Sequence, residues 1–235
     1  MKAARKRAQA IARGRGREAR VIIPLAFEVA ARISARPLDA FRNDPTQLAN
    51  ALTELHAAIG ADGIVVALAQ GMEQAAGVGA DAAALCANGP VAPSLEACRR
   101  LRETHGDDVA LLAGLSGPRA LARELGVDVA AAGDCFTALV KAFCAAGSDV
   151  VLVLDDAEDG AAADWQAAVK TADNIARFHQ ASLLGLDDGI LPAPWRVPFD
   201  APAADGLGFI VTARPLPHDT DIALLRQWVA AVRGA

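Results

Sequence analysis

Several apolar segments of this 235-residue chain are followed at once by polar or ionisable side chains. Asp155 and Asp156 come directly after the apolar run 149–154. Paired carboxylates can share a proton, and one of them can serve as a general base when burial raises its pKa. An ordinary acidic turn explains the same residues, since Asp159 and Gly160 follow closely. Other polar residues after apolar runs form a candidate site for one small ligand: Glu28, Gln70, Ser116, Asp187, Asp188 and Arg214.

The cysteines and histidines indicate no metal site. The spacings of Cys86, Cys98, Cys135 and Cys144 match neither a disulfide framework nor the short pairs of a structural zinc site. Three of these cysteines fall on predicted helices, and Cys86 falls in a predicted loop. No histidine has a partner at metal-ligand spacing. We therefore expect no metal, no cofactor and a reducing, cytoplasmic environment.

The elements that would position these side chains alternate between strand-like and helical patterns. This alternation is typical of an α/β protein with a parallel sheet, and it favours a (β/α) barrel of the TIM type, in which the site lies on the loops after the strands. A doubly wound sheet is the alternative, but no glycine-rich turn follows the first strand. Six strands are predicted, at 21–27, 63–68, 109–115, 149–154, 181–186 and 208–212.

Helix signals separate these strands. Asp44 and Pro45 are an N-cap and a first helical proline, and Gly60 ends that helix. Ser94 and Asp219 are the N-caps expected for two later helices. Further helices are predicted near 28–35, 118–126, 135–147 and 165–179, whereas three prolines and many small residues at 187–207 leave little room for another strand-helix unit.

The charge is unevenly distributed. Residues 1–20 hold eight of the 23 lysines and arginines and a single acid, Glu18, so the rest of the chain is strongly acidic. We expect a solvated basic helix at 1–19, followed by one domain at 20–235. The acidic body repels polyanions, so we expect no nucleic-acid partner. No apolar run approaches the roughly 18 to 20 residues of a membrane span, so we expect no membrane association.

Three stretches of sequence resemble the uroporphyrinogen decarboxylase superfamily, which includes the methylcobalamin:coenzyme M methyltransferases. The stretches are Arg20-Val21-Ile22-Ile23-Pro24-Leu25-Ala26-Phe27 with Asn43-Asp44-Pro45, Gly60-Ala61-Asp62-Gly63-Ile64-Val65-Val66, and Gly208-Phe209-Ile210-Val211-Thr212 with Pro217-His218-Asp219-Thr220. The resemblance implies an eight-stranded (β/α) barrel and a lyase-like or transferase-like activity. It also places His218 in a segment that faces the site, although a helix-entry role is the simpler interpretation.

The residues on which the two family reactions depend are replaced in this chain. Ala69 stands where the resemblance places the decarboxylase aspartate, so we expect no uroporphyrinogen decarboxylation. Leu186, Asp188 and Arg214 stand at the three zinc-ligand positions of the methyltransferases. If the last two positions still meet in space, Asp188 and Arg214 form an ion pair in place of zinc.

Together these patterns predict a divergent, shortened member of the superfamily. It would act on a small or tetrapyrrole-like carboxylate, with Asp155, Asp188 and Arg214 as catalytic residues, and with Glu28, Gln70, Ser116, Asp187 and His218 binding the ligand. The alternative is a non-catalytic binding or partner subunit. Missing strand-helix units would expose strand edges, so we expect a dimer whose interface adjoins 187–207.

Overall fold

A computed structural model describes residues 3–15, 19–68, 71–155, 163–186, 191–201 and 207–234. Seven strands lie in these ranges: β1 Arg20–Ile22, β2 Gly63–Ala67, β3 Ala110–Ser116, β4 Val150–Leu154, β5 Ser182–Gly185, β6 Trp195–Val197 and β7 Gly208–Thr212. The six predicted strands are present, but the first ends at Ile22 instead of continuing to Phe27. The short strand β6 was not predicted.

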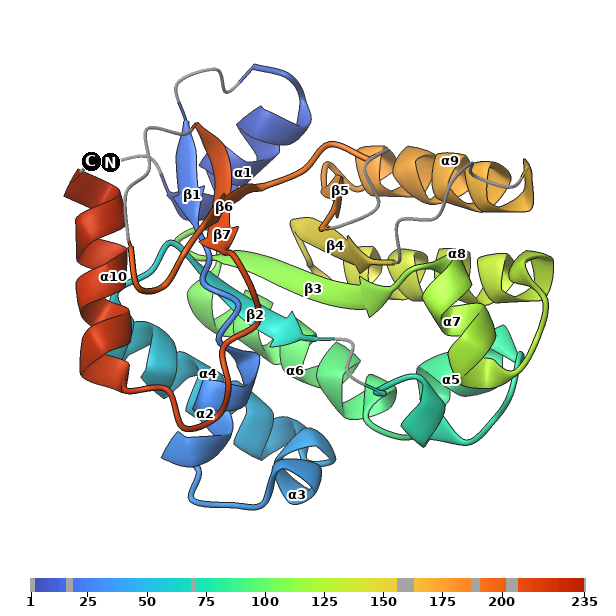
Figure 1. Ribbon diagram of the computed structural model, residues 1–235, viewed down its shortest axis with the longest axis horizontal. Coiled ribbons are helices and arrows are strands. Elements are labelled where there is room, and N and C mark those ends of the chain that lie inside the picture. Colours follow the sequence, from blue (N-terminus) through green and yellow to red (C-terminus); the bar gives the residue numbers. More distant parts are fainter. Residues whose placement is uncertain are drawn as a thin grey trace.

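The strands form two sheets in which every neighbouring pair is parallel. The first sheet has the order β1-β7-β6 and the second the order β2-β3-β4-β5. Asp62 joins the sheets, because its backbone N–H donates to the carbonyl oxygen of Ile22 at 2.9 Å and its carboxylate accepts from the N–H of Ile22 at 3.0 Å. The chain therefore has an α/β fold with parallel sheets (Figure 1).

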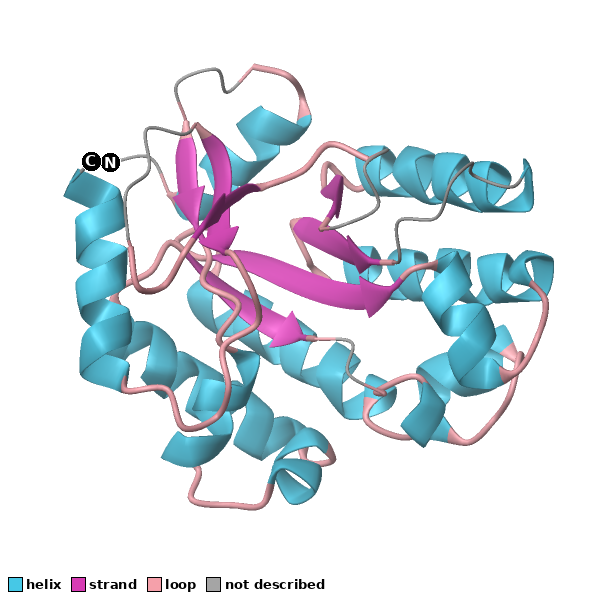
Figure 2. Cartoon of the chain, in the orientation of Figure 1, coloured by secondary structure: helices cyan, strands magenta, loops and turns pink. Residues whose placement is uncertain are grey.

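Helices surround these sheets (Figure 2). They are α1 Ala4–Ala12, α2 Phe27–Ile33, α3 Leu38–Arg42, α4 Pro45–Ile59, α5 Ala82–Ala87, α6 Val91–His105, α7 Pro118–Leu125, α8 Val129–Ala146, α9 Ala163–Phe178 and α10 Ile222–Gly234, with a 3₁₀ turn η1 at Gln74–Ala76. Every residue of β2 and β3 is buried. Full burial explains why these strands are continuously apolar in sequence instead of alternating.

Local signals set some helix ends as predicted and others differently. Asp44 caps α4 by accepting from the N–H groups of Thr46 and Gln47, and Gly60 ends it in the left-handed conformation. Two predicted caps were wrong. Ser94 lies inside α6, where its buried hydroxyl donates to the carbonyl oxygen of Pro90. Asp221, and not Asp219, accepts from the first free N–H groups of α10.

Helix α8 is long and apolar enough to cross a bilayer by length and composition, which the short apolar runs of the sequence did not indicate. Half of it is buried in the protein. It packs against α5, α6, α7 and α9, and Phe136, Leu139 and Phe143 are fully buried. Its apolar composition is that of a core helix.

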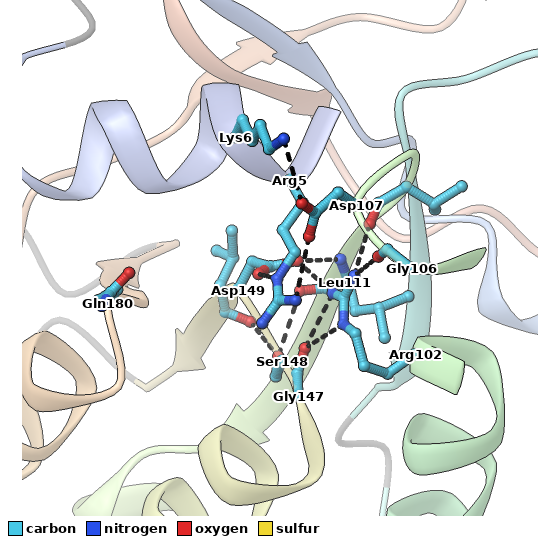
Figure 3. Close-up of polar contacts among 12 residues, drawn as sticks. Arg5, Lys6, Arg102, Gly106, Asp107, Leu111, Gly147, Ser148, Asp149 and Gln180 are labelled. Atoms are coloured by element: carbon cyan, nitrogen blue, oxygen red, sulfur yellow. Dashed lines mark hydrogen bonds and ion pairs between the residues drawn. The ribbon is translucent and has the colours of Figure 1, made fainter. Parts of the chain in front are cut away.

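The basic N-terminal helix α1 lies against the N-terminal ends of the strands. The sequence predicted a solvated helix and did not predict this packing. Arg5 of α1 and Arg102 of α6 both donate to the buried carboxylate of Asp149, which immediately precedes β4 (Figure 3). Arg7 donates to Asp62 at 2.6 Å. Because these guanidinium groups are used inside the molecule, the basic N-terminal segment is in large part a structural element.

Candidate functional site

Two glutamates, one fully buried and one partly exposed, lie at the carboxyl-terminal end of the β2-β3 edge. Glu73, which follows β2, has no exposed side-chain surface and accepts from the backbone N–H of Ser116 at 3.1 Å. The hydroxyl of Ser116 lies 3.3 Å from Oε2 of Glu73 and 2.9 Å from Oε1 of Glu124. We call these three residues, Glu73, Ser116 and Glu124, the glutamate cluster.

The pKa of both carboxyl groups is raised. Burial and then the charge of Glu124 raise the pKa of Glu73 to about 7, although hydrogen bonds, including those from Ser116, oppose the shift. Burial also raises the pKa of Glu124, against the hydroxyl of Ser116 and the charge of Arg123. A carboxylic acid that titrates near neutrality can both give and take a proton under physiological conditions.

The segment that follows β3 places Glu124 in the cluster. Ser116 is the last residue of β3, Pro118 is the first residue of α7, and Glu124 lies near the end of this helix. The helix turns back so that Glu124 reaches the Ser116 hydroxyl eight residues earlier. Oε2 of Glu124 is buried without a hydrogen-bond partner among the described residues. This oxygen is an available acceptor within the cluster.

Asp155 lies beside the glutamate cluster but holds the start of α7. Its carboxylate accepts from the N–H of Arg119 at 3.2 Å, the N–H of Ala120 at 2.8 Å and the indole N–H of Trp165 at 2.8 Å. A side chain at Gly117 would have its Cβ 2.4 Å from Oδ2 of Asp155, so only glycine fits there. With three donors already bound, this carboxylate is well suited to anchoring the helix.

Other predicted site residues have hydrogen-bond or ion-pair partners outside the glutamate cluster, are exposed, or lie outside the described residues. Glu28 forms an ion pair with Arg42 at 2.9 Å, and both side chains are mostly buried. Arg214 and His218 follow β7 and are exposed, while the carbonyl oxygen of Arg214 accepts from the hydroxyl of Thr212. Gln70, Asp156, Asp187 and Asp188 fall outside the described residues, together with Ala69. The Asp188–Arg214 ion pair therefore stays a prediction.

The thiols and imidazoles form no ligand set in the described part of the chain, where no group of three or more His, Cys, Asp or Glu side chains could hold a metal ion. Cys98 and Cys144 are buried in α6 and α8, and burial raises the pKa of each thiol to about 12. Cys86 lies in α5 and is half-buried, so its predicted loop position was wrong. Burial raises the pKa of its thiol as well.

Glu73 and Glu124 were not among the residues that the sequence pointed to. Glu124 follows Arg123 in an ordinary helical pattern, and Glu73 lies in a stretch rich in glycine and alanine. The one available signal was position, because Glu73 comes five residues after the second predicted strand, although most of the chosen candidates follow their strands more closely. Its partners come from β3 and α7, which no local pattern reveals.

Comparison with known proteins shows the fold of this chain and no closer relationship. No protein-family model matches it, and no curated protein matches it significantly in sequence. Among solved structures, a methyltransferase from Methanosarcina mazei superimposes with a TM-score of 0.76 at 14% sequence identity. The match covers 100% of this chain and 99% of the methyltransferase chain. The two proteins therefore share their fold over their whole length.

Proposed function

We propose that this chain is a divergent enzyme of the uroporphyrinogen decarboxylase and methyltransferase superfamily, in which Glu73 transfers a proton to or from a small carboxylate substrate. The main observation behind this proposal is that the Glu73 carboxyl is buried beside Ser116 and Glu124 at the carboxyl-terminal end of the strands. The fold shared with a methyltransferase and the three resembling sequence stretches support the superfamily.

A shortened (β/α) barrel is the architecture that goes with this proposal. The strand order β6-β7-β1 continues through the Asp62 link into β2-β3-β4-β5, which is the order that a barrel cut open after β5 would have. The N–H of Gly185 at the end of β5 donates to the carbonyl oxygen of Pro192 at 3.1 Å, shortly before β6. In such a barrel the glutamate cluster lies at the catalytic end.

The proton requirements of decarboxylation and of methyl removal explain why a protonated carboxyl is useful there. When a substrate loses carbon dioxide, the remaining carbon must take up a proton, and when an oxygen loses a methyl group, that oxygen must take up a proton. A carboxylic acid with a pKa of about 7 is half-protonated at neutral pH and matches either need. Arg214, exposed after β7, is the proposed group for binding a substrate carboxylate.

The test is an NMR screen of small carboxylates and methoxylated acids in D₂O. We expect the protein to introduce deuterium at a carbon that loses carbon dioxide, or to remove a methyl signal when a methyl acceptor is supplied. Glu73→Gln should reduce this turnover at least a hundredfold. Glu54→Gln, at an exposed glutamate of α4, is the matched control and should leave the rate unchanged. Equal turnover by Glu73→Gln and the parent protein would contradict the proposal.

A non-catalytic partner subunit is the second candidate, because large apolar side chains are exposed on β6 and at the end of α9. Trp195 of the edge strand β6 is 51% exposed, and Phe178 at the end of α9 is 83% exposed. Exposed aromatic side chains are enriched at protein interfaces. Sedimentation that shows a stable monomer at micromolar concentration, for the parent protein and for Trp195→Ser alike, would leave this candidate without support.

A further inference from the structure

The hydroxyl of Ser116 is the only group that the structure places between the two carboxyls of the glutamate cluster within its described residues. It lies 3.3 Å from Oε2 of Glu73 and 2.9 Å from Oε1 of Glu124. A hydroxyl has one proton to donate and can accept another. When one carboxyl is protonated and the other is ionised, the serine therefore accepts from the first and donates to the second.

The two carboxyls differ in their access to solvent. Glu73 is completely buried, whereas Glu124 is partly exposed near the end of α7. A buried catalytic acid has to recover its proton after each turnover, and a closed environment slows direct exchange with water. The partly exposed Glu124, joined to Glu73 through one hydroxyl, supplies a short route.

We infer that Ser116 joins Glu73 and Glu124 into a proton relay, through which the buried Glu73 carboxyl exchanges its proton with the partly exposed Glu124 carboxyl. In one step the Glu73 O–H gives its proton to Oγ of Ser116, while the Ser116 O–H gives its own proton to Oε1 of Glu124. The products are the Glu73 carboxylate, an unchanged serine and protonated Glu124, so protons and charge balance. This inference rests on the proposed role of Glu73.

The charges around the relay permit transfer in both directions. Among the described residues, the charged groups that act on the two carboxyls are each other and Arg123. The two glutamates raise the cost of ionising both at once, and Arg123 favours the ionised form of Glu124. One shared proton is therefore the favoured state near neutral pH.

Infrared spectroscopy tests the relay without any substrate. The C=O stretch of a protonated, buried carboxyl is followed while the pH is changed, first at equilibrium and then after a rapid pH jump. The band that disappears in Glu73→Gln reports the Glu73 carboxyl. Ser116→Ala and Glu124→Gln should slow the protonation of Glu73 at least tenfold, because exchange then needs a local opening of the fold.

Two further variants keep the test decisive. Ser94→Ala removes another buried serine hydroxyl, one that donates to the carbonyl oxygen of Pro90, and should change the rate less than twofold. Ser116→Thr keeps a hydroxyl and should restore most of the rate if Ser116→Ala is slow or poorly folded. Rates within twofold of the parent in both Ser116→Ala and Glu124→Gln would overturn the relay and leave the role of Glu73 intact. A neutral-pH carboxyl band that persists in Glu73→Gln would instead remove the basis of the proposed function.

Discussion

The buried carboxyl groups at the two ends of the strands have neighbours of opposite charge. Those at the N-terminal end are positive, and the neighbour of Glu73 at the carboxyl-terminal end is another carboxyl. At the N-terminal end, Asp149 receives hydrogen bonds from Arg5, Arg102 and the backbone N–H of Leu111. At the carboxyl-terminal end, neither Glu73 nor Glu124 forms an ion pair within the described residues, and the charge of Glu124 acts on Glu73. Burial raises the pKa of Asp149 and Glu73 alike, but only for Glu73 does a second carboxyl add to the rise.

This difference separates a group that supports the fold from one that is available for chemistry. An arginine-paired carboxylate is fixed in charge and geometry, and its partners come from α1 and α6. An unpaired acid beside a like charge is costly to stability, and such cost is common where a protein keeps a group for function. The comparison predicts that substitutions at the two ends change stability in opposite directions.

The largest change in stability should come from removing the buried carboxylate at the N-terminal end of the strands. Asp149→Ala removes one acceptor from each of the guanidinium groups of Arg5 and Arg102 and the acceptor of the Leu111 N–H, and we expect a loss of about 3 kcal/mol in the free energy of unfolding. Urea denaturation at pH 7 measures it. Asp107→Ala removes a half-exposed partner of the same Arg5 and should cost about 1 kcal/mol or less. Equal losses in both variants would show that burial of Asp149 is unimportant.

A smaller effect of opposite sign is expected at the carboxyl-terminal end. Folded Glu73 keeps its proton up to about pH 7, whereas the unfolded chain loses it near pH 4.5. The folded state therefore binds more protons between these values, so the free energy of unfolding falls as the pH rises through this window. Glu73→Gln removes this fall and should be more stable than the parent at pH 8 by about 2 to 3 kcal/mol.

The comparison at pH 5 is the control for that variant. The folded states of both proteins are then uncharged at this position, so their thermal midpoints should agree much more closely. Glu54→Gln should shift neither curve, because its carboxyl is exposed. A pH-independent effect of Glu73→Gln would mean that Glu73 is ionised in the folded protein.

The smallest expected change in stability concerns two histidines near the N-terminal ends of the strands. His56 and His105 lie with ring centroids 5.7 Å apart. Burial, and then His105, lowers the pKa of His56; burial, and then Arg102, lowers the pKa of His105. The unfolded chain therefore binds protons first, and stability falls as the pH drops below about 6.5.

Replacing one of these rings should weaken that response to acid. His56→Gln should reduce the loss of stability between pH 7 and pH 5 by less than about 1 kcal/mol. Thermal melts across this range measure it, with the exposed His218→Gln as the control. An undiminished acid response in His56→Gln would assign the response to His105 or to other groups, because the raised pKa values of Glu73 and Asp149 act in the opposite direction.

Local patterns in the sequence predicted the elements better than the site. The continuous apolar runs of β2, β3 and β4, the cap at Asp44 and the stop at Gly60 depend on neighbouring residues and were confirmed. Strand β6 has three residues with two of them exposed, and so lacks an apolar run. The glutamate cluster joins residues that are 43 and 8 positions apart, so only the packed structure shows it.

The position of α1 also has a consequence for how the chain is made. Its arginines pair with Asp62, Asp107 and Asp149, so the helix leaves the ribosome long before its last partner exists. A helix of nine residues is too short to be stable alone in water. During synthesis α1 therefore cannot reach its final, fully paired state until Asp149 and β4 have been translated. Helix α1 is thus translated well before its last partner, and a nascent chain stalled before residue 149 should remain open to proteases at this helix.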